Sequence, residues 1–307
     1  MTTSETPRRI LVLADESPAA SAAVRSGARI AEALQEPLTI LGVARRPGDD
    51  ERIEAALADA FAAARSRVAS VEVTQATGEL LDVASRRLAE SPSSLVVAGA
   101  RWRTGAASAR IAPGVWDVVQ SLQPPVLVTP AREGNFASAL FCTGGERFIE
   151  EGARFAARLL TALSVPVTVF HVLPPLPGMY GDRMRDQETD IADFIASGSR
   201  TARNVQRQVE IFRAAGTDVS LRLATGDVAQ RVLDEIRRRE HDLLVVGSSP
   251  ERGRLRTYML GDLTREIVGR AGRAFLVVRS RPPGFFAELW RSLREGASEG
   301  AAGKARA

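Results

Sequence analysis

One segment of this 307-residue chain occurs twice, and the two copies keep the same internal spacing. Residues 76–99 and 224–247 both begin with Ala-Thr-Gly and both end in an apolar run closed by glycine. Matching positions are 148 residues apart throughout, without a gap. The apolar segments 124–130 and 273–279 follow in the same order. A repeat of this length indicates two similar folding units, which agrees with about one domain per 150 residues.

The two copies differ upstream of this segment. Residues 10–34 match residues 139–160 at a separation of only 128, so the second copy carries about twenty additional residues between its first and third strands. The surplus falls in residues 173–187, where the density of proline and glycine predicts a loop.

Short apolar runs alternate with helical patterns of ten or more residues in each copy. This alternation is typical of a parallel sheet covered by helices on both faces. We expect one domain over residues 1–131 and a second over 138–281, joined by a linker within 129–137. The expected strands cover residues 10–14, 37–43, 71–76, 95–98 and 126–129 in the first copy, and 139–142, 165–172, 218–224, 243–246 and 275–278 in the second.

The composition argues against several classes of protein. Cys142 is the single cysteine, so no intrachain disulfide can form, and this fits a reducing compartment. We find neither a signal peptide nor a run of about 18 apolar residues, and therefore expect a cytoplasmic protein. The chain has 41 basic and 37 acidic residues, and every basic residue except Lys304 is an arginine. They are dispersed along helical segments, so no nucleic acid is expected as a partner.

Several local features recur in both copies. In the first copy the opening strand ends near Asp15 and Ser17. In both copies Ala-Thr-Gly precedes the third helix, a fourth strand ends in glycine, and a glycine-containing loop, a helix and a closing apolar strand follow. With these features residues 9–279 resemble the universal stress protein family, as a tandem pair. The resemblance implies an α/β fold of two flavodoxin-like, Rossmann-like (HUP-type) doubly wound parallel-sheet domains. It also implies a regulatory module of the stress response, with ATP and Mg²⁺ bound at the carboxyl edge of the strands in many members.

The ATP-binding members of this family share a pattern after the fourth strand: Gly, two residues, Gly, nine residues, Gly, then Ser or Thr. Glycines let backbone N–H groups approach phosphate oxygens, and a helix N-terminus adds partial positive charge. The second copy keeps Gly247, but Pro250 stands at the second glycine position and has no N–H. Gly253 is the candidate replacement in this copy.

Farther along the second copy, Gly261 and Asp262 occupy the place of the final glycine and hydroxyl, at an expected helix N-terminus. The loop that follows Gly247 also contains three arginines, Arg252, Arg254 and Arg256. These arginines can offset the negative charge of Asp262 and bind an anion. The alternative is that the stretch is only a turn leading into a helix that Asp262 caps.

The first copy departs from the pattern at other positions. By resemblance, Asp15 and Ser17 would face the adenine-ribose side of a nucleotide, whereas the second copy has Thr143 in place of the acid. Gly99 and Gly114 remain as candidates for the phosphate side. Trp102 and Val115 stand where the pattern has its second glycine and its hydroxyl. The alternative for Asp15 is a structural one, capping the first helix.

No catalytic constellation is found. The sequence has no phosphate-binding Gly-x-x-x-x-Gly-Lys-Ser/Thr loop and no dinucleotide fingerprint, so we expect no enzyme, and a slow ATPase activity stays open without an identified base. His171 and His241 are too few for a metal site, and we expect packed or hydrogen-bonded histidines. Cys142 falls in a predicted strand and is expected to act as a small apolar filler.

The C-terminal residues 282–307 form a separate segment. Its apolar residues fall on one stripe of a helix and therefore predict an amphipathic helix. The residues of this stripe are Phe285, Phe286, Leu289, Trp290 and Leu293. Such a helix folds back on its own domain or docks on a partner. With only two cations among its charges, membrane contact is not expected. The last residues are small and polar and predict a flexible tail.

The two domains are expected to form an intramolecular pseudo-dimer, with higher assembly left open. The resemblance implies that the closing strands 126–129 and 275–278 pair edge to edge, which would protect both edges. Two hypotheses follow for function. The first is a sensor that binds ATP or a related nucleotide; the second is a nucleotide-free interaction protein whose pockets have both degenerated. The sequence does not identify a protein partner.

Overall fold

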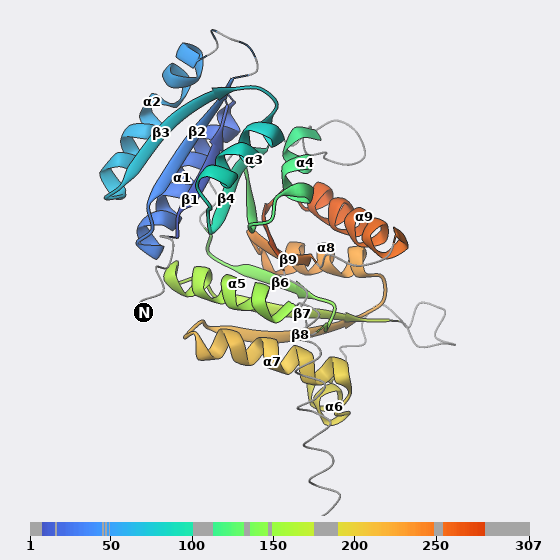
Figure 1. Cartoon of the computed structure of the whole chain (residues 1–307). Helices are drawn as coiled ribbons and strands as arrows, with labels where there is room; N and C mark the ends of the chain where they lie inside the picture. The colour runs from blue at the N-terminus through green and yellow to red at the C-terminus, as the bar shows by residue number, and fades with distance from the viewer. Residues whose placement is uncertain are drawn as a thin grey trace, which may run out of the picture.

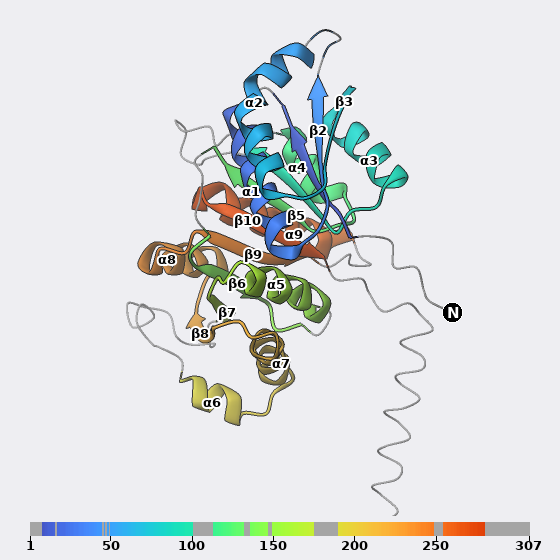
Figure 2. The ribbon, with the colours of Figure 1, turned by 90° about the vertical axis from the view of Figure 1, so that its left-hand side faces the viewer.

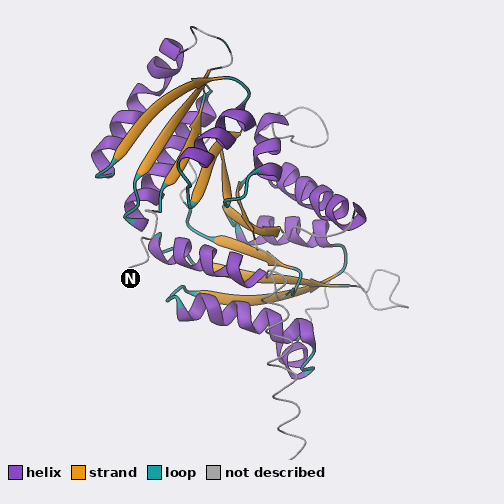
Figure 3. Cartoon of the chain, viewed as in Figure 1, coloured by secondary structure: helices purple, strands orange, loops and turns teal. Residues whose placement is uncertain are grey.

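A computed structural model describes residues 8–15, 17–44, 46, 48, 50–100, 113–131, 136–146, 149–174, 190–248 and 254–279. These residues form one twisted sheet flanked by helices on both faces (Figures 1 and 3). In the first half, α1 and α2 lie on one side of the strands and α3 on the other (Figure 2).

The sheet has the strand order β3-β2-β1-β4-β5-β10-β9-β6-β7-β8. Five strands from each copy therefore occupy one half of the sheet, and the second half repeats the order of the first outward from the centre. All neighbours within a half pair in parallel. The strands are β1 (Ile10–Ala14), β2 (Leu38–Ala44), β3 (Val71–Thr77), β4 (Leu95–Ala100), β5 (Val126–Pro130), β6 (Ala139–Thr143), β7 (Val167–Leu173), β8 (Val219–Thr225), β9 (Leu243–Ser248) and β10 (Ala274–Arg279).

The helices are α1 (Pro18–Leu34), α2 (Asp50–Arg67), α3 (Leu80–Glu90), α4 (Pro113–Ser121), α5 (Glu150–Ala162), α6 (Ile191–Ala196), α7 (Arg200–Ala214), α8 (Val228–Arg239) and α9 (Arg254–Ala271). One core cluster packs α1, α2, α5 and α7 on one face of the sheet. The other packs α3, α4, α8 and α9 on the opposite face. Alternate residues of one strand enter the two clusters, as Val12 and Leu13 do, because successive strand side chains point to opposite faces. The continuous apolar runs of the sequence thus reflect burial on both faces.

The two halves join through their closing strands. Strands β5 and β10 pair antiparallel, with Phe275 opposite Val128 and Val277 opposite Val126. The predicted edge-to-edge pairing is therefore confirmed, and it removes two exposed strand edges from the molecule.

Side chains reinforce this junction. The guanidinium group of Arg279 donates to the carbonyl oxygens of Val119 and Gln120 at the end of α4, where helix carbonyls lack intrahelical partners. On the other face Arg158 of α5 donates to the buried carboxylate of Glu36 at 3.0 Å. Each contact connects one half to the other, so the halves are held by polar bonds as well as by the shared sheet.

The structure corrects the expected start of one helix. We expected a helix N-terminus at Gly261 and Asp262, but α9 already begins at Arg254 and both residues lie inside it. The residues before Gly261 are mostly good helix formers such as Arg, Leu and Met, and the helix continues through both of its internal glycines, Gly261 and Gly269. Among the described residues, we find no helix with the length and apolar character needed to cross a bilayer.

Candidate functional site

Asp15 and Ser17 form a tight turn at the carboxyl end of β1. The Asp15 Oδ1 atom accepts a hydrogen bond from the backbone N–H of Ser17 at 2.9 Å. Ser17 in turn caps α1, its hydroxyl accepting from the N–H of Ala20 at 3.3 Å. Ser17 is buried while Asp15 is exposed. The carboxylate therefore has a structural bond through one oxygen and presents its charge to solvent at the edge where parallel α/β sheets bind ligands.

Gly99, next to the end of β4, allows a close approach of backbone to backbone. A Cβ atom at this position would lie 2.2 Å from the carbonyl oxygen of Ala19 in α1. The first turn of α1 thus rests directly on β4, and glycine is required there by packing alone. This packing also brings the start of α1 against the strand that leads into the candidate phosphate loop.

Gly114 lies in the first turn of α4 and is exposed. Apart from its chain neighbours and its own helix backbone, no atom of the described residues lies within 4 Å of the position that a Cβ would take. Pro113 begins the helix, a position that suits proline because its missing N–H would have no partner there. Residues 101–112 and 249–253, and with them Trp102, Pro250 and Gly253, lie outside the described residues. The side chain of Asp262 lies outside them as well.

Gly247, the counterpart of Gly99, has a different neighbour. Its Cβ position lies 3.3 Å from the side chain of Ile149 and not against backbone. A side chain therefore fills the space that the backbone of α1 takes in the first half. Sequence reasoning treated the two glycines as equivalent, and the structure shows that only Gly99 is held by a backbone contact.

The second half builds the same turn without a charge. The hydroxyl of Thr143 accepts from the N–H of Gly145 at 2.9 Å, as Asp15 does from Ser17. Thr143 is buried, and Gly145 takes a positive φ of 76°, which glycine adopts without steric cost. The predicted replacement of the acid by Thr143 thus preserves the turn and removes the anion.

Side chains from β7 and α7 hold three carbonyl groups of this second turn. His171 Nδ1–H donates to the carbonyl oxygen of Thr143 at 2.8 Å. The amide of Asn204 donates to the carbonyl oxygen of Gly145 at 2.9 Å, and that of Gln208 to Glu146 at 3.2 Å. No equivalent set of bonds is found around Asp15 among the described residues.

Helix α6 completes the enclosure. Phe194 is buried, and its ring centroid lies 5.7 Å from that of His171. Burial lowers the pKa of His171 while its bond to Thr143 opposes the change, so the ring is neutral at neutral pH. The interpretation of His171 as a packed, hydrogen-bonded residue is confirmed. Helix α6 follows the insertion of the second copy directly, and the length difference between the copies was the only sequence signal for it.

A second polar cluster lies under α8, away from the carboxyl edge. Burial alone would raise the pKa of Glu235, but His241 and Arg222 hold it below its ordinary value. His241 Nδ1 and the hydroxyl of Ser138 are 2.7 Å apart, and Asp242 accepts from the N–H groups of Ala137 and Ser138. The cluster therefore fastens the start of β6 to the start of β9, which is a structural role.

Cys142 lies near the carboxyl end of β6 and is half-buried. Burial and the charge of Glu235 raise the pKa of its thiol well above the ordinary value, so the thiolate that nucleophilic chemistry needs is scarce. Within the described part of the chain, no group of three or more His, Cys, Asp or Glu residues is placed to hold a metal ion.

Comparison with known proteins agrees with this architecture. The model of the universal stress protein family matches residues 6–130 and again residues 138–279. Among solved structures, a putative universal stress protein from Pseudomonas aeruginosa UCBPP-PA14 shares 18% identity at a TM-score of 0.64, covering 89% of this chain and 94% of that one. A functionally unknown protein from Pseudomonas aeruginosa PAO1 shares 18% identity at 0.62, covering 95% and 98%.

A universal stress protein from Archaeoglobus fulgidus DSM 4304 shares 14% identity at a TM-score of 0.60, covering 88% of this chain and 98% of that one. No curated protein matches the chain. Identities this low show a shared fold, whereas the family model matches most of the sequence itself. The chain therefore belongs to the universal stress protein family and carries two of its domains in tandem, in the flavodoxin-like α/β fold.

Proposed function

We propose that this protein is a regulatory nucleotide-binding protein that uses only its first half for the ligand. The observation that carries the proposal is the contrast between two equivalent turns. Asp15 presents an exposed carboxylate at the carboxyl edge, whereas Thr143 is buried and its turn is held by side chains of β7 and α7.

The chemistry of Asp15 suits a ribose. Its Oδ1 atom is engaged by the N–H of Ser17, and the second carboxylate oxygen can accept from ribose hydroxyls. A hydrogen bond to a charged group contributes about 1.5–3 kcal/mol. At the phosphate side, Gly114 leaves open space in the first turn of α4, where free N–H groups favour an anion. Mg²⁺ enters in this proposal with the phosphates of ATP.

The second half then serves as a structural partner of the first. Its turn carries no acid, and the carbonyl groups that surround it are bonded to Asn204, Gln208 and His171. In this proposal the protein works in the cytoplasm and responds to nucleotide levels under stress without catalysing a reaction. The competing hypothesis, a nucleotide-free interaction protein, differs in that neither half binds.

Calorimetric titration with AMP and with Mg-ATP separates these alternatives. We expect one site per chain, and Asp15→Ala should weaken binding about 10- to 100-fold, as expected for the loss of a charged hydrogen bond. Asp227→Ala is the matched control, because Asp227 is an exposed acid whose Oδ1 also accepts a backbone N–H, at the start of α8. Absence of binding to the wild-type protein at millimolar ligand would leave only the interaction hypothesis.

A further inference from the structure

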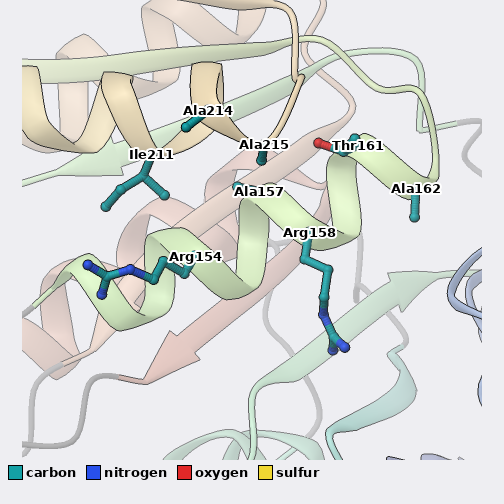
Figure 4. Close-up of a pocket in the computed structure, with 8 residues that line it drawn as sticks. All are labelled: Arg154, Ala157, Arg158, Thr161, Ala162, Ile211, Ala214 and Ala215. Atoms are coloured by element: carbon teal, nitrogen blue, oxygen red, sulfur yellow. The ribbon is translucent and has the colours of Figure 1, made fainter.

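An open groove of about 580 Å³ runs between α5 and α7 on the surface of the second half (Figure 4). Its lining consists mainly of small or apolar side chains: Ala157, Thr161, Ala162, Ile211, Ala214 and Ala215. Ala214 and Ala215 are exposed. In Figure 4, Arg158 extends away from α7, consistent with its bond to Glu36. Arg154 lies at the end of the groove nearest the start of α5, and its side chain is 61% exposed.

The end of the last described strand, β10, lies close enough to the groove for the C-terminal residues of the chain to reach it. Strand β10 ends at Arg279, and 28 residues follow it in the sequence. Helix α5 packs against β10, and β6, which leads into α5, is separated from β10 only by β9. Neighbouring strands are about 4.8 Å apart, so β6 lies about 10 Å from β10. Residues 280–284 extend up to about 17 Å, enough for residue 285 to reach the beginning of α5.

The pattern of the C-terminal segment matches the groove in length. The apolar stripe of residues 285–293 would be about 12 Å long as a helix, at about 1.5 Å per residue. The groove follows α5 from Arg154 to Ala162, the same number of residues. A floor of alanines lets large side chains approach closely, and the stripe consists of aromatic and leucine side chains.

Charges flank the stripe in a complementary arrangement. At about 100° per residue, Glu288 and Glu295 lie on one flank of the helix and Arg294 on the other. On the α5 side of the groove, Arg154 bonds to Glu150 of the same helix at 3.2 Å and is otherwise largely exposed. On α7, the exposed Glu210 is next to the lining residue Ile211. A helix lying along the groove in one direction therefore brings acids toward Arg154 and a base toward Glu210.

From these observations we propose that residues 285–293 form an amphipathic helix that packs its apolar stripe into the groove between α5 and α7 of the same chain. The C-terminal segment then acts as a covering element of the second half. This inference does not depend on nucleotide binding.

Hydrogen–deuterium exchange of the full chain tests the proposal. The amides of residues 285–293 should exchange at least about 10-fold more slowly than in an isolated peptide of the same residues. Ala214→Arg should remove this protection, because an arginine fills the groove; the position is exposed, so the fold tolerates the change. Ala58→Arg on α2, the counterpart of α7 in the first half, is also an exposed site and should leave the protection intact.

A charge reversal tests the direction of the helix. Arg154→Glu should reduce the protection, and adding Glu288→Arg should restore it. Unprotected amides in the wild-type protein, or protection that Ala214→Arg leaves unchanged, would overturn the proposal. So would protection that rises with protein concentration, which indicates a second copy as the site, or protection that requires anionic phosphatidylserine vesicles, which indicates a lipid surface.

Discussion

Replacing Gly99 by alanine places a methyl carbon where the backbone of α1 already lies. The new Cβ would be 2.2 Å from the carbonyl oxygen and 2.3 Å from the carbonyl carbon of Ala19, whereas ordinary contacts begin at 3.4 Å. The start of α1 would have to move by more than 1 Å. Overpacking typically costs about 1–3 kcal/mol, and a backbone obstacle cannot rotate away, so we expect a loss of about 3 kcal/mol in the free energy of unfolding.

The second half supplies the control at the equivalent position. In Gly247→Ala the added carbon lies 3.3 Å from a side-chain atom of Ile149, which needs to shift by only a few tenths of an ångström. Alanine in a strand also restricts the unfolded chain more than glycine does, by about 0.5–1 kcal/mol. The two effects nearly cancel, so Gly247→Ala should change the stability by less than about 1 kcal/mol.

Urea unfolding followed by circular dichroism measures both variants against the wild-type protein. We expect Gly99→Ala to be less stable than Gly247→Ala by at least about 2 kcal/mol. Stabilities that agree within about 0.5 kcal/mol, or a larger loss in Gly247→Ala, would show that α1 does not rest on β4 through a backbone contact.

Three further predictions concern side chains that are buried or half-buried. Because burial lowers the pKa of His171, the unfolded chain binds the proton at a higher pH than the folded protein does. The contribution of His171 to the free energy of unfolding should therefore be complete above about pH 6.5 and decrease as the pH falls from there toward the folded pKa. Between pH 7 and 5 the free energy of unfolding of His171→Asn should decrease less steeply than that of the wild-type protein, and an equally steep decrease would contradict this. Arg279→Ala leaves the carbonyl oxygens of Val119 and Gln120 without their donor and should cost about 1–3 kcal/mol in thermal unfolding, whereas the exposed Arg238→Ala should cost almost nothing. The raised pKa of Cys142 predicts slow reaction with a thiol reagent at pH 8 in the folded protein and fast reaction after unfolding, and equal rates would contradict it.

The alternation of elements could be predicted from the sequence because it depends on local pattern. Strands such as β1 and β9 are continuous apolar runs buried on both faces, and a run of this kind between two helical patterns has few other interpretations. The pairing of β5 with β10 was expected from the family resemblance, and it agrees with the protection that an apolar strand edge requires.

The features that distinguish the two sites could not be predicted, because they depend on residues distant in the sequence. Phe194 meets His171 across the insertion, and Asn204 reaches the turn from near the start of α7, about sixty residues along the chain. Gly99 contacts the backbone of α1, whereas Gly247 contacts only the side chain of Ile149. This difference depends on how closely α1 and α5 approach the sheet. The start of α9 was misjudged since the glycine pattern suggested a helix boundary at Gly261, and helix propensity extends the helix seven residues earlier.

Photoaffinity labelling with 8-azido-ATP, followed by peptide mapping, distinguishes a nucleotide site in the first half from one in the second. We expect a label within residues 8–100 that excess AMP reduces and that is absent in Asp15→Ala. A competable label within residues 136–248 would contradict it, because that result would place the ligand at the turn that Thr143, Asn204 and Gln208 hold closed.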